Sequence, residues 1–202
     1  MVTGLFFGTF NPVHRGHEAL VHSFLHSNHL DDLWIIVTPS PPHKHVASLA
    51  PFEHRWNMLQ LVFGTRSEVS LSDVEQRITP PHYTLKTLSY LKASYPDRSL
   101  ILCIGGDSLQ DLPNWFDYRS IGQKAELLVA ERPGVSLDVP DELSAFSVHF
   151  CEHDPVEVSS TDIRERMASG HEESARDLHP EVAAYIKKHG LYREEKPFGL
   201  PD

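Results

Sequence analysis

The sequence has few cysteines and no long apolar run, and each absence excludes a class of protein. Its two cysteines, Cys103 and Cys151, lie far apart and form no C-x-x-C motif, so we expect a reduced, cytoplasmic protein. No apolar run reaches the length of a membrane span. The N-terminus has no basic segment followed by a long apolar one, so neither a signal peptide nor a membrane partner is predicted.

Positive charge is also scarce. The chain has 18 Lys and Arg against 28 Asp and Glu, a formal net charge of −10. Binding to nucleic acid normally needs a basic face, so no nucleic-acid partner is predicted, although a small phosphate-bearing substrate needs only local positive groups. The 14 histidines show no H-E-x-x-H motif and no Cys/His spacing of a zinc site, so no metal site built by the protein is predicted.

Short apolar runs alternate with segments of helical spacing throughout the 202 residues. Residues 33–38 and 100–104 are almost continuously apolar, as expected of strands covered on both faces. Alternating strands and helices imply a mainly parallel sheet with right-handed crossovers. We therefore predict one α/β domain over residues 1–193, with a Rossmann-like, doubly wound sheet and helices on both faces, and a flexible tail over 194–202.

The pattern also predicts where the elements lie. The expected strands cover residues 1–7, 33–38, 69–74, 100–104, 125–131 and 144–150. The expected helices cover residues 16–29, 52–63, 84–94, 107–112, 161–169 and 180–189.

The most informative segment is LFFGTFNPVHRGH at residues 5–17, where a strand passes through a tight polar loop into a helix. If the helix begins near Gly16, His17 lies in its first turn and His14 just before it. A phosphate at this place would meet backbone N–H groups and the positive end of the helix dipole. The alternative is a histidine pair that stands at a helix start without a function.

A second segment, VSSTDIR at residues 158–164, supports two interpretations. Ser159 followed three residues later by Asp162 resembles a capping box, which would be purely structural. Three hydroxyl groups at a helix start with Arg164 one turn later would also form an anion site, because a guanidinium can donate two hydrogen bonds to phosphate oxygens.

Together the two segments resemble the nucleotidyltransferase superfamily of the H-x-G-H type, whose members transfer a nucleotidyl group from a nucleoside triphosphate to a phosphate acceptor. The resemblance implies that His14, His17 and Arg164 are catalytic. It also implies an ATP site formed by Gly8, Thr9, Phe10, His14, His17, Gly105, Asp107, Ser160, Thr161 and Arg164.

Such a transfer needs little acid–base machinery, because a phosphate oxygen is already a nucleophile. It needs alignment of the reactants and neutralisation of charge on the α-phosphate and the departing pyrophosphate. The resemblance implies Mg²⁺ as a cofactor, held mainly by the ATP phosphates and water rather than by a cage of carboxylates.

Further segments over about residues 3–193 resemble the bacterial nicotinate-nucleotide adenylyltransferases, among them PPHK at 41–44, YTLKTL at 83–88 and GGDSL at 105–109. This resemblance implies an enzyme of NAD biosynthesis that joins nicotinate mononucleotide to ATP, giving deamido-NAD and pyrophosphate. The acceptor site that it implies consists of Asn11, His43, Lys44, Tyr83, Thr84, Trp115 and Arg132.

In that family the nicotinate ring stacks on the tryptophan, and backbone N–H groups near the threonine receive its carboxylate; here these are Trp115 and Thr84. Three of the predicted site residues also have a purely structural interpretation: Trp115 as a core residue, Lys44 as a solvated loop charge and Asp107 as a helix cap. For Arg132 a binding role and a structural role are equally open.

Three positions depart from the family pattern: Phe7 stands where glycine is usual, Asn11 where aspartate is common, and Phe116 where tyrosine is common. Alternatives therefore remain open. The same chemistry could serve nicotinamide mononucleotide or phosphopantetheine, or the chain could be a non-catalytic nucleotide-binding module. Formation of a homo-oligomer is also left open.

Overall fold

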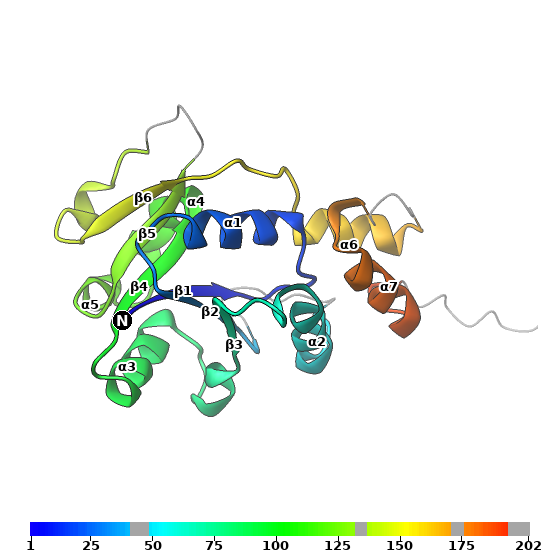
Figure 1. Ribbon diagram of the computed structural model, residues 1–202, viewed down its shortest axis with the longest axis horizontal. Helices are drawn as coiled ribbons and strands as arrows, with labels where there is room; N and C mark the ends of the chain where they lie inside the picture. Colours follow the sequence, from blue (N-terminus) through cyan, green and yellow to red (C-terminus); the bar gives the residue numbers. More distant parts are fainter. Residues whose placement is uncertain (41–48, 132–136, 171–175, 194–202) are drawn as a thin grey trace, which may run out of the picture.

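The computed structural model describes residues 1–40, 49–131, 137–170 and 176–193. Its six strands form one parallel sheet in the order β3-β2-β1-β4-β5-β6 (Figure 1). The strands are β1 (Val2–Gly8), β2 (Asp32–Val37), β3 (Val69–Ser72), β4 (Ser99–Gly105), β5 (Glu126–Glu131) and β6 (Val148–Glu152). The fold is the predicted doubly wound, Rossmann-like sheet. From β1 to β3 the strands are added towards one edge of the sheet, and from β4 to β6 they are added towards the other, so the order of addition reverses between β1 and β4.

Of the helices in the described residues, the first five lie between strands along the chain, and the last two follow the final strand. The helices are α1 (Arg15–Leu25), α2 (Phe52–Phe63), α3 (Thr84–Ser94), α4 (Gly106–Asp111), α5 (Tyr118–Gly122), α6 (Ser160–Ala168) and α7 (Pro180–His189). Short 3₁₀ turns form η1 (Val74–Arg77), η2 (Leu112–Asn114) and η3 (Asp141–Leu143). In Figure 1, α1 and α3 lie on opposite sides of the sheet, and α6 and α7 lie beyond the end of β1, near the start of α1.

Alternate strand residues enter two apolar cores, one on each face of the sheet. On β1, Phe6 joins the core beneath α1 and α2, whereas Leu5 joins the core beneath α3, α4 and α5. On β2, Ile35 and Ile36 divide in the same way. Side chains of successive strand residues point to opposite faces, so a strand buried on both faces must be apolar throughout.

Most predicted boundaries are confirmed to within a few residues, and the largest errors concern the end of α1, which lies at Leu25 and not at residue 29, and the start of β6. We predicted a strand over 144–150, but Phe146 donates its backbone N–H to the Leu143 carbonyl, 2.9 Å away, so the chain is still turning there. The parallel ladder with β5 pairs Val148 with Leu127, and β6 therefore begins at Val148. The short helix α5 was not predicted. The tail over 194–202 lies outside the described residues, and the single domain over 1–193 stays a prediction.

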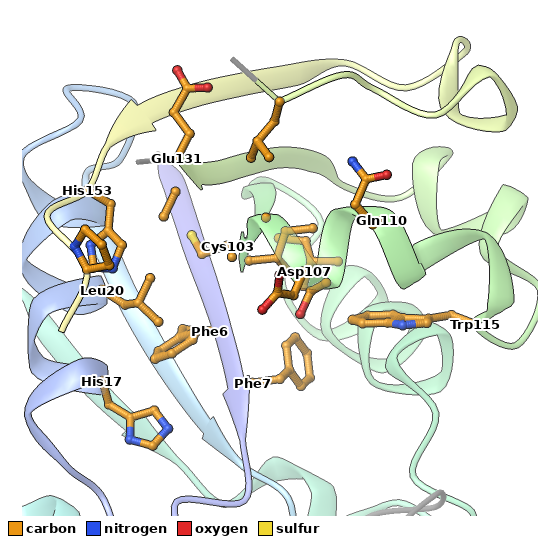
Figure 2. Close-up of a pocket in the computed structure, with 18 residues that line it drawn as sticks. Phe6, Phe7, His17, Leu20, Cys103, Asp107, Gln110, Trp115, Glu131 and His153 are labelled. Atoms are coloured by element: carbon orange, nitrogen blue, oxygen red, sulfur yellow. The ribbon is translucent and has the colours of Figure 1, made fainter. Parts of the chain in front are cut away.

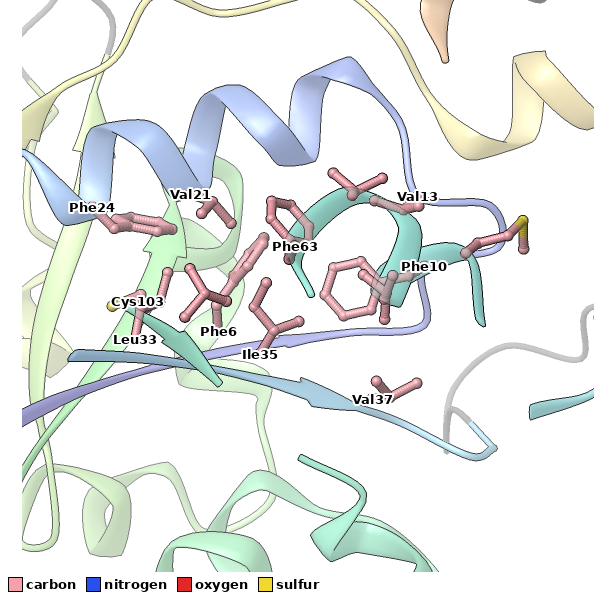
Figure 3. Packing of buried hydrophobic residues seen from close by; sticks show 14 of the residues in the cluster. Phe6, Phe10, Val13, Val21, Phe24, Leu33, Ile35, Val37, Phe63 and Cys103 are labelled. Carbon is pink, nitrogen blue, oxygen red and sulfur yellow. The ribbon is translucent and has the colours of Figure 1, made fainter. Parts of the chain in front are cut away.

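The first core gives a direct test of this packing. Phe24 has no exposed surface and meets the ring of Phe6 edge-on at a centroid distance of 5.5 Å (Figure 3). Removing this ring leaves a cavity that the two-sided sheet cannot close, so we expect Phe24→Ala to lower the free energy of unfolding by about 3–5 kcal/mol. Urea unfolding measures the change, and Val156→Ala, at a 43 % exposed position, should change it by less than about 0.5 kcal/mol. Similar losses for the two variants would contradict the packing.

Candidate active site

The loop between β1 and α1 lies at the point where the strand order reverses, between β1 and β4. The two histidines of the motif stand at the end of this loop and in the helix that follows it. His14 is the residue before α1, and His17 lies in the first turn, as predicted. Their rings lie against each other with centroids 3.8 Å apart, and the ring of Phe10 meets His17 edge-on at 4.9 Å. Position 8, just before this loop, has room only for glycine, because a Cβ atom there would lie 2.6 Å from the Phe10 ring. The ring of Phe10 is therefore a buried core side chain that packs against His17.

Both histidines are neutral at pH 7. Burial lowers the pKa of His14 to about 4, with a small opposing effect of Asp177. Burial, together with the neighbouring His14, holds the pKa of His17 well below its ordinary value. The backbone N–H of His14 donates to Nδ1 of His17 at 3.2 Å, so the neutral ring of His17 carries its proton on Nε2. His17 is therefore a hydrogen-bond donor at Nε2.

The start of α6 is attached to the β1–α1 loop. The Ser160 hydroxyl donates to the Pro12 carbonyl at 3.0 Å. Nη1 of Arg164 donates to the Asn11 carbonyl at 2.8 Å, and Nη2 donates to the Thr161 hydroxyl at 3.2 Å. Two segments almost 150 residues apart therefore meet, and they are the two segments that the sequence singled out.

Ser159 has the structural role that the alternative interpretation gave it. Its hydroxyl accepts the backbone N–H of Asp162 at 3.1 Å and caps α6. Capping occupies only this residue of the segment, and Ser160 and Arg164 contact the loop instead. The capping interpretation is confirmed for Ser159, and an anion site at this helix start stays a prediction.

A cavity of about 720 Å³ opens beside this group, at the ends of β1, β4 and β5. His17 forms part of its wall, together with Gly105, Asp107 and Trp115 of the predicted site. Figure 2 shows His17 on one side of this space and Trp115 on the other, with Asp107 between them. The cavity lies at the reversal between β1 and β4, which is where ligands bind in open parallel sheets.

Trp115 lines the cavity, and its neighbour in the chain contacts Tyr83, another residue predicted for the acceptor. Its indole N–H donates to Asp111 at 3.0 Å, which fixes the ring. The next residue, Phe116, stacks on Tyr83 with centroids 4.4 Å apart and an angle of 11° between the planes. Tyr83 precedes Thr84, the first residue of α3, so this stack places the start of α3 next to the segment that carries Trp115, although Thr84 itself does not line the cavity.

Three predicted acceptor residues, His43, Lys44 and Arg132, lie outside the described residues. Asn11 is described, and its side chain is buried. Its Oδ1 accepts the backbone N–H of Ala50 at 3.0 Å and the Tyr192 hydroxyl at 2.8 Å. These bonds show a role in holding the loop, and a role of Asn11 in acceptor binding stays a prediction.

Sequence reasoning missed Arg55, which is only 1 % exposed. Its guanidinium donates to the carbonyls of Thr9, Thr38, Pro39 and Ala50 at 2.7 to 3.0 Å. Burial lowers its pKa to about 10, so it keeps its charge at pH 7. A signal was present: Arg55 shares the buried stripe of α2 with Met58, Leu59 and Val62, at helical spacing, where a charge is unexpected.

Comparison with known proteins decides the family. The sequence model of the family described as cytidylyltransferase-like matches residues 5–166. The "Probable nicotinate-nucleotide adenylyltransferase" of Bacteroides fragilis is 39 % identical over 180 residues, covering 89 % of this chain and 88 % of the relative. The nicotinate-nucleotide adenylyltransferase of Bacillus subtilis is 33 % identical over 190 residues, covering 94 % and 97 %. The chain belongs to the nicotinate-nucleotide adenylyltransferase family.

The fold agrees with that of a solved structure. The nicotinic acid mononucleotide adenylyltransferase of Plasmodium falciparum, in complex with NaAD, superposes with a TM-score of 0.79 over 95 % of this chain and 97 % of the other. At 20 % identity this likeness shows a shared fold. The expected resemblance to nicotinate-nucleotide adenylyltransferases is thus confirmed. Among the described residues, no helix is long and apolar enough to cross a membrane.

The neutral state of His14 predicts a pH dependence of stability. Its pKa rises from about 4 in the folded protein to 6.5 when unfolding exposes it, so between these values the unfolded chain binds the additional proton. Stability therefore falls as the pH falls from 6.5 towards 4, with a slope from this group of up to about 1.4 kcal/mol per pH unit. Urea unfolding across this range should show a smaller slope for His14→Asn than for wild type. Equal slopes would mean that the pKa of His14 does not change when the protein unfolds, which would contradict its burial as a neutral ring.

Proposed function

We propose that this family member transfers AMP from ATP to nicotinate mononucleotide at the crevice between β1 and β4. The observation that carries the proposal is that His17 and Trp115 both belong to the wall of one cavity. His17 stands in the first turn of α1, and Arg164 of α6 holds the Asn11 carbonyl of the loop before this helix, so these groups suit phosphates. Trp115 suits an aromatic ring, and its neighbour Phe116 stacks on Tyr83, the residue before Thr84, so the start of α3 suits a carboxylate.

In the proposed reaction an oxygen of the acceptor's 5′-phosphate attacks the α-phosphorus of ATP in line. A bond forms between that oxygen and the α-phosphorus, and the bond to the bridging oxygen of pyrophosphate breaks. Nε2–H of His17 donates to a phosphate oxygen, and Arg164 neutralises part of the charge on the departing pyrophosphate. The residues align the reactants and stabilise charge, and no group of the protein needs to take a proton.

Magnesium is proposed to arrive with ATP. Among the described residues no three histidines, cysteines or carboxylates gather into a group that could hold a metal ion, so the phosphate oxygens and water would hold it. When bound, the ion neutralises charge on the phosphates. The remaining assignments of the ATP and acceptor sites, and the cytoplasmic location, stay predictions.

Pyrophosphate release tests the acceptor. Wild-type protein with ATP and magnesium is offered nicotinate mononucleotide, nicotinamide mononucleotide or phosphopantetheine separately. We expect kcat/KM to be at least about tenfold higher for the nicotinate acceptor, because an amide lacks the charge-assisted bonds that backbone N–H groups give to a carboxylate. A preference for another acceptor would keep the transfer chemistry and reject the roles of Thr84 and Trp115.

His17→Ala separates an enzyme from a non-catalytic nucleotide-binding module. We expect kcat to fall by about 10²–10³-fold, the usual loss when one donor to a developing charge is removed. The matched control is His22→Ala on the same helix, whose ring stacks on His26 at an exposed position. It should keep kcat within about twofold. A binding module would instead keep most of its affinity for ATP in either variant. Even as wild type, it would release pyrophosphate no faster than a reaction without protein.

A further inference from the structure

The last residues that the structure describes, after α7, contact the loop between β1 and α1. After α7, Gly190 has a φ of 63° and the backbone N–H of Leu191 donates to the Ile186 carbonyl at 3.1 Å, which ends the helix. Tyr192 then also has a positive φ, 62°, a conformation that tyrosine rarely adopts. In this conformation its hydroxyl reaches Oδ1 of Asn11, 2.8 Å away.

Asn11 lies in the centre of the segment Thr9–Pro12, whose carbonyls are held by side chains from other elements. Arg55 of α2 holds the Thr9 carbonyl, Arg164 of α6 holds that of Asn11, and Ser160 holds that of Pro12. In a trans peptide the N–H points opposite to the C=O, so the held carbonyls of Thr9 and Pro12 also set the directions of the N–H groups of Phe10 and Val13, whereas Pro12 has no N–H of its own. The fixed loop thus presents its amides in one arrangement.

Among the described residues after α7, Tyr192 takes part in this network, and it acts on the buried side chain of Asn11 rather than on a carbonyl. Burial raises the pKa of Tyr192, so its hydroxyl keeps the proton that it donates. The Oδ1 of Asn11 also accepts the backbone N–H of Ala50, which lies two residues before α2. Asn11 therefore joins the segment before α2 to the segment after α7.

We propose that Tyr192 is a positioning residue for ATP: it orients Asn11 and thereby the loop Thr9–Pro12. This inference rests on the proposed function, because it assigns to Tyr192 an effect on the nucleotide half of the same site. It acts through Asn11, not by contact with the reacting atoms. Its effect falls on ATP because Asn11 and Pro12 are bonded to Arg164 and Ser160, which the proposed function places at the phosphates, whereas Trp115 lies across the cavity from His17 (Figure 2).

Tyr192→Phe removes only the hydroxyl. We expect affinity for a non-hydrolysable ATP analogue, measured by calorimetry without acceptor, and kcat/KM for ATP to fall about three- to tenfold, the range that one partly buried hydrogen bond supports. KM for nicotinate mononucleotide should change by less than about twofold. The matched control is Tyr185→Phe on α7, whose hydroxyl bonds to His54 and Asn57 on α2 at 2.9 and 3.1 Å and does not touch the loop.

A double-mutant cycle separates positioning from general stability. If Tyr192 acts through Asn11, the variant with both Asn11→Ala and Tyr192→Phe should bind the analogue as weakly as Asn11→Ala alone. Losses that multiply, or equal analogue affinities for Tyr192→Phe and Tyr185→Phe, would overturn the inference while wild-type activity stands. A wild-type protein that binds no ATP analogue would overturn the proposed function and this inference with it.

Discussion

The guanidinium of Arg55 is the group on which the geometry of the site most depends. It is buried and charged, and it donates hydrogen bonds to carbonyls that follow β1, that follow β2 and that precede α2. A buried cation is tolerated only where its donors are satisfied, and a buried carbonyl likewise needs a donor. Three separate segments are therefore fixed relative to one another by one side chain, and the loop that carries Phe10 and Asn11 starts from this fixed point.

Contacts from the second half of the chain complete that loop. Ser160 and Arg164 at the start of α6, and Tyr192 after α7, all donate to Asn11 or Pro12. The strand order makes this arrangement possible, because the reversal between β1 and β4 leaves an open crevice at the carboxyl ends of the strands. The loop is thus held by an assembly of remote segments, whereas the stack of Phe116 on Tyr83 places Trp115 beside the start of α3.

The chemistry of the site follows from burial. Two adjacent histidines, if both were charged, would repel each other in a region of low polarity, and burial instead keeps both neutral. The hydrogen bond from the His14 amide then decides which nitrogen of His17 carries the proton. A neutral imidazole with a fixed N–H can donate a hydrogen bond to a phosphate oxygen. This agrees with a reaction in which the nucleophile is already ionised.

The sequence alone determined the strand and helix order, because apolar runs and helical spacing are local signals, and it identified the two motifs, whose residue types suit phosphate. It could not show that Ser160 reaches Pro12 or that Tyr192 reaches Asn11, since those bonds join residues 148 and 181 positions apart. It also gave Arg55 no role, although the position of a charge on an apolar helix face was visible. Only the tertiary structure brings these side chains to one loop, because their contacts depend on how the sheet and helices pack rather than on neighbouring residues.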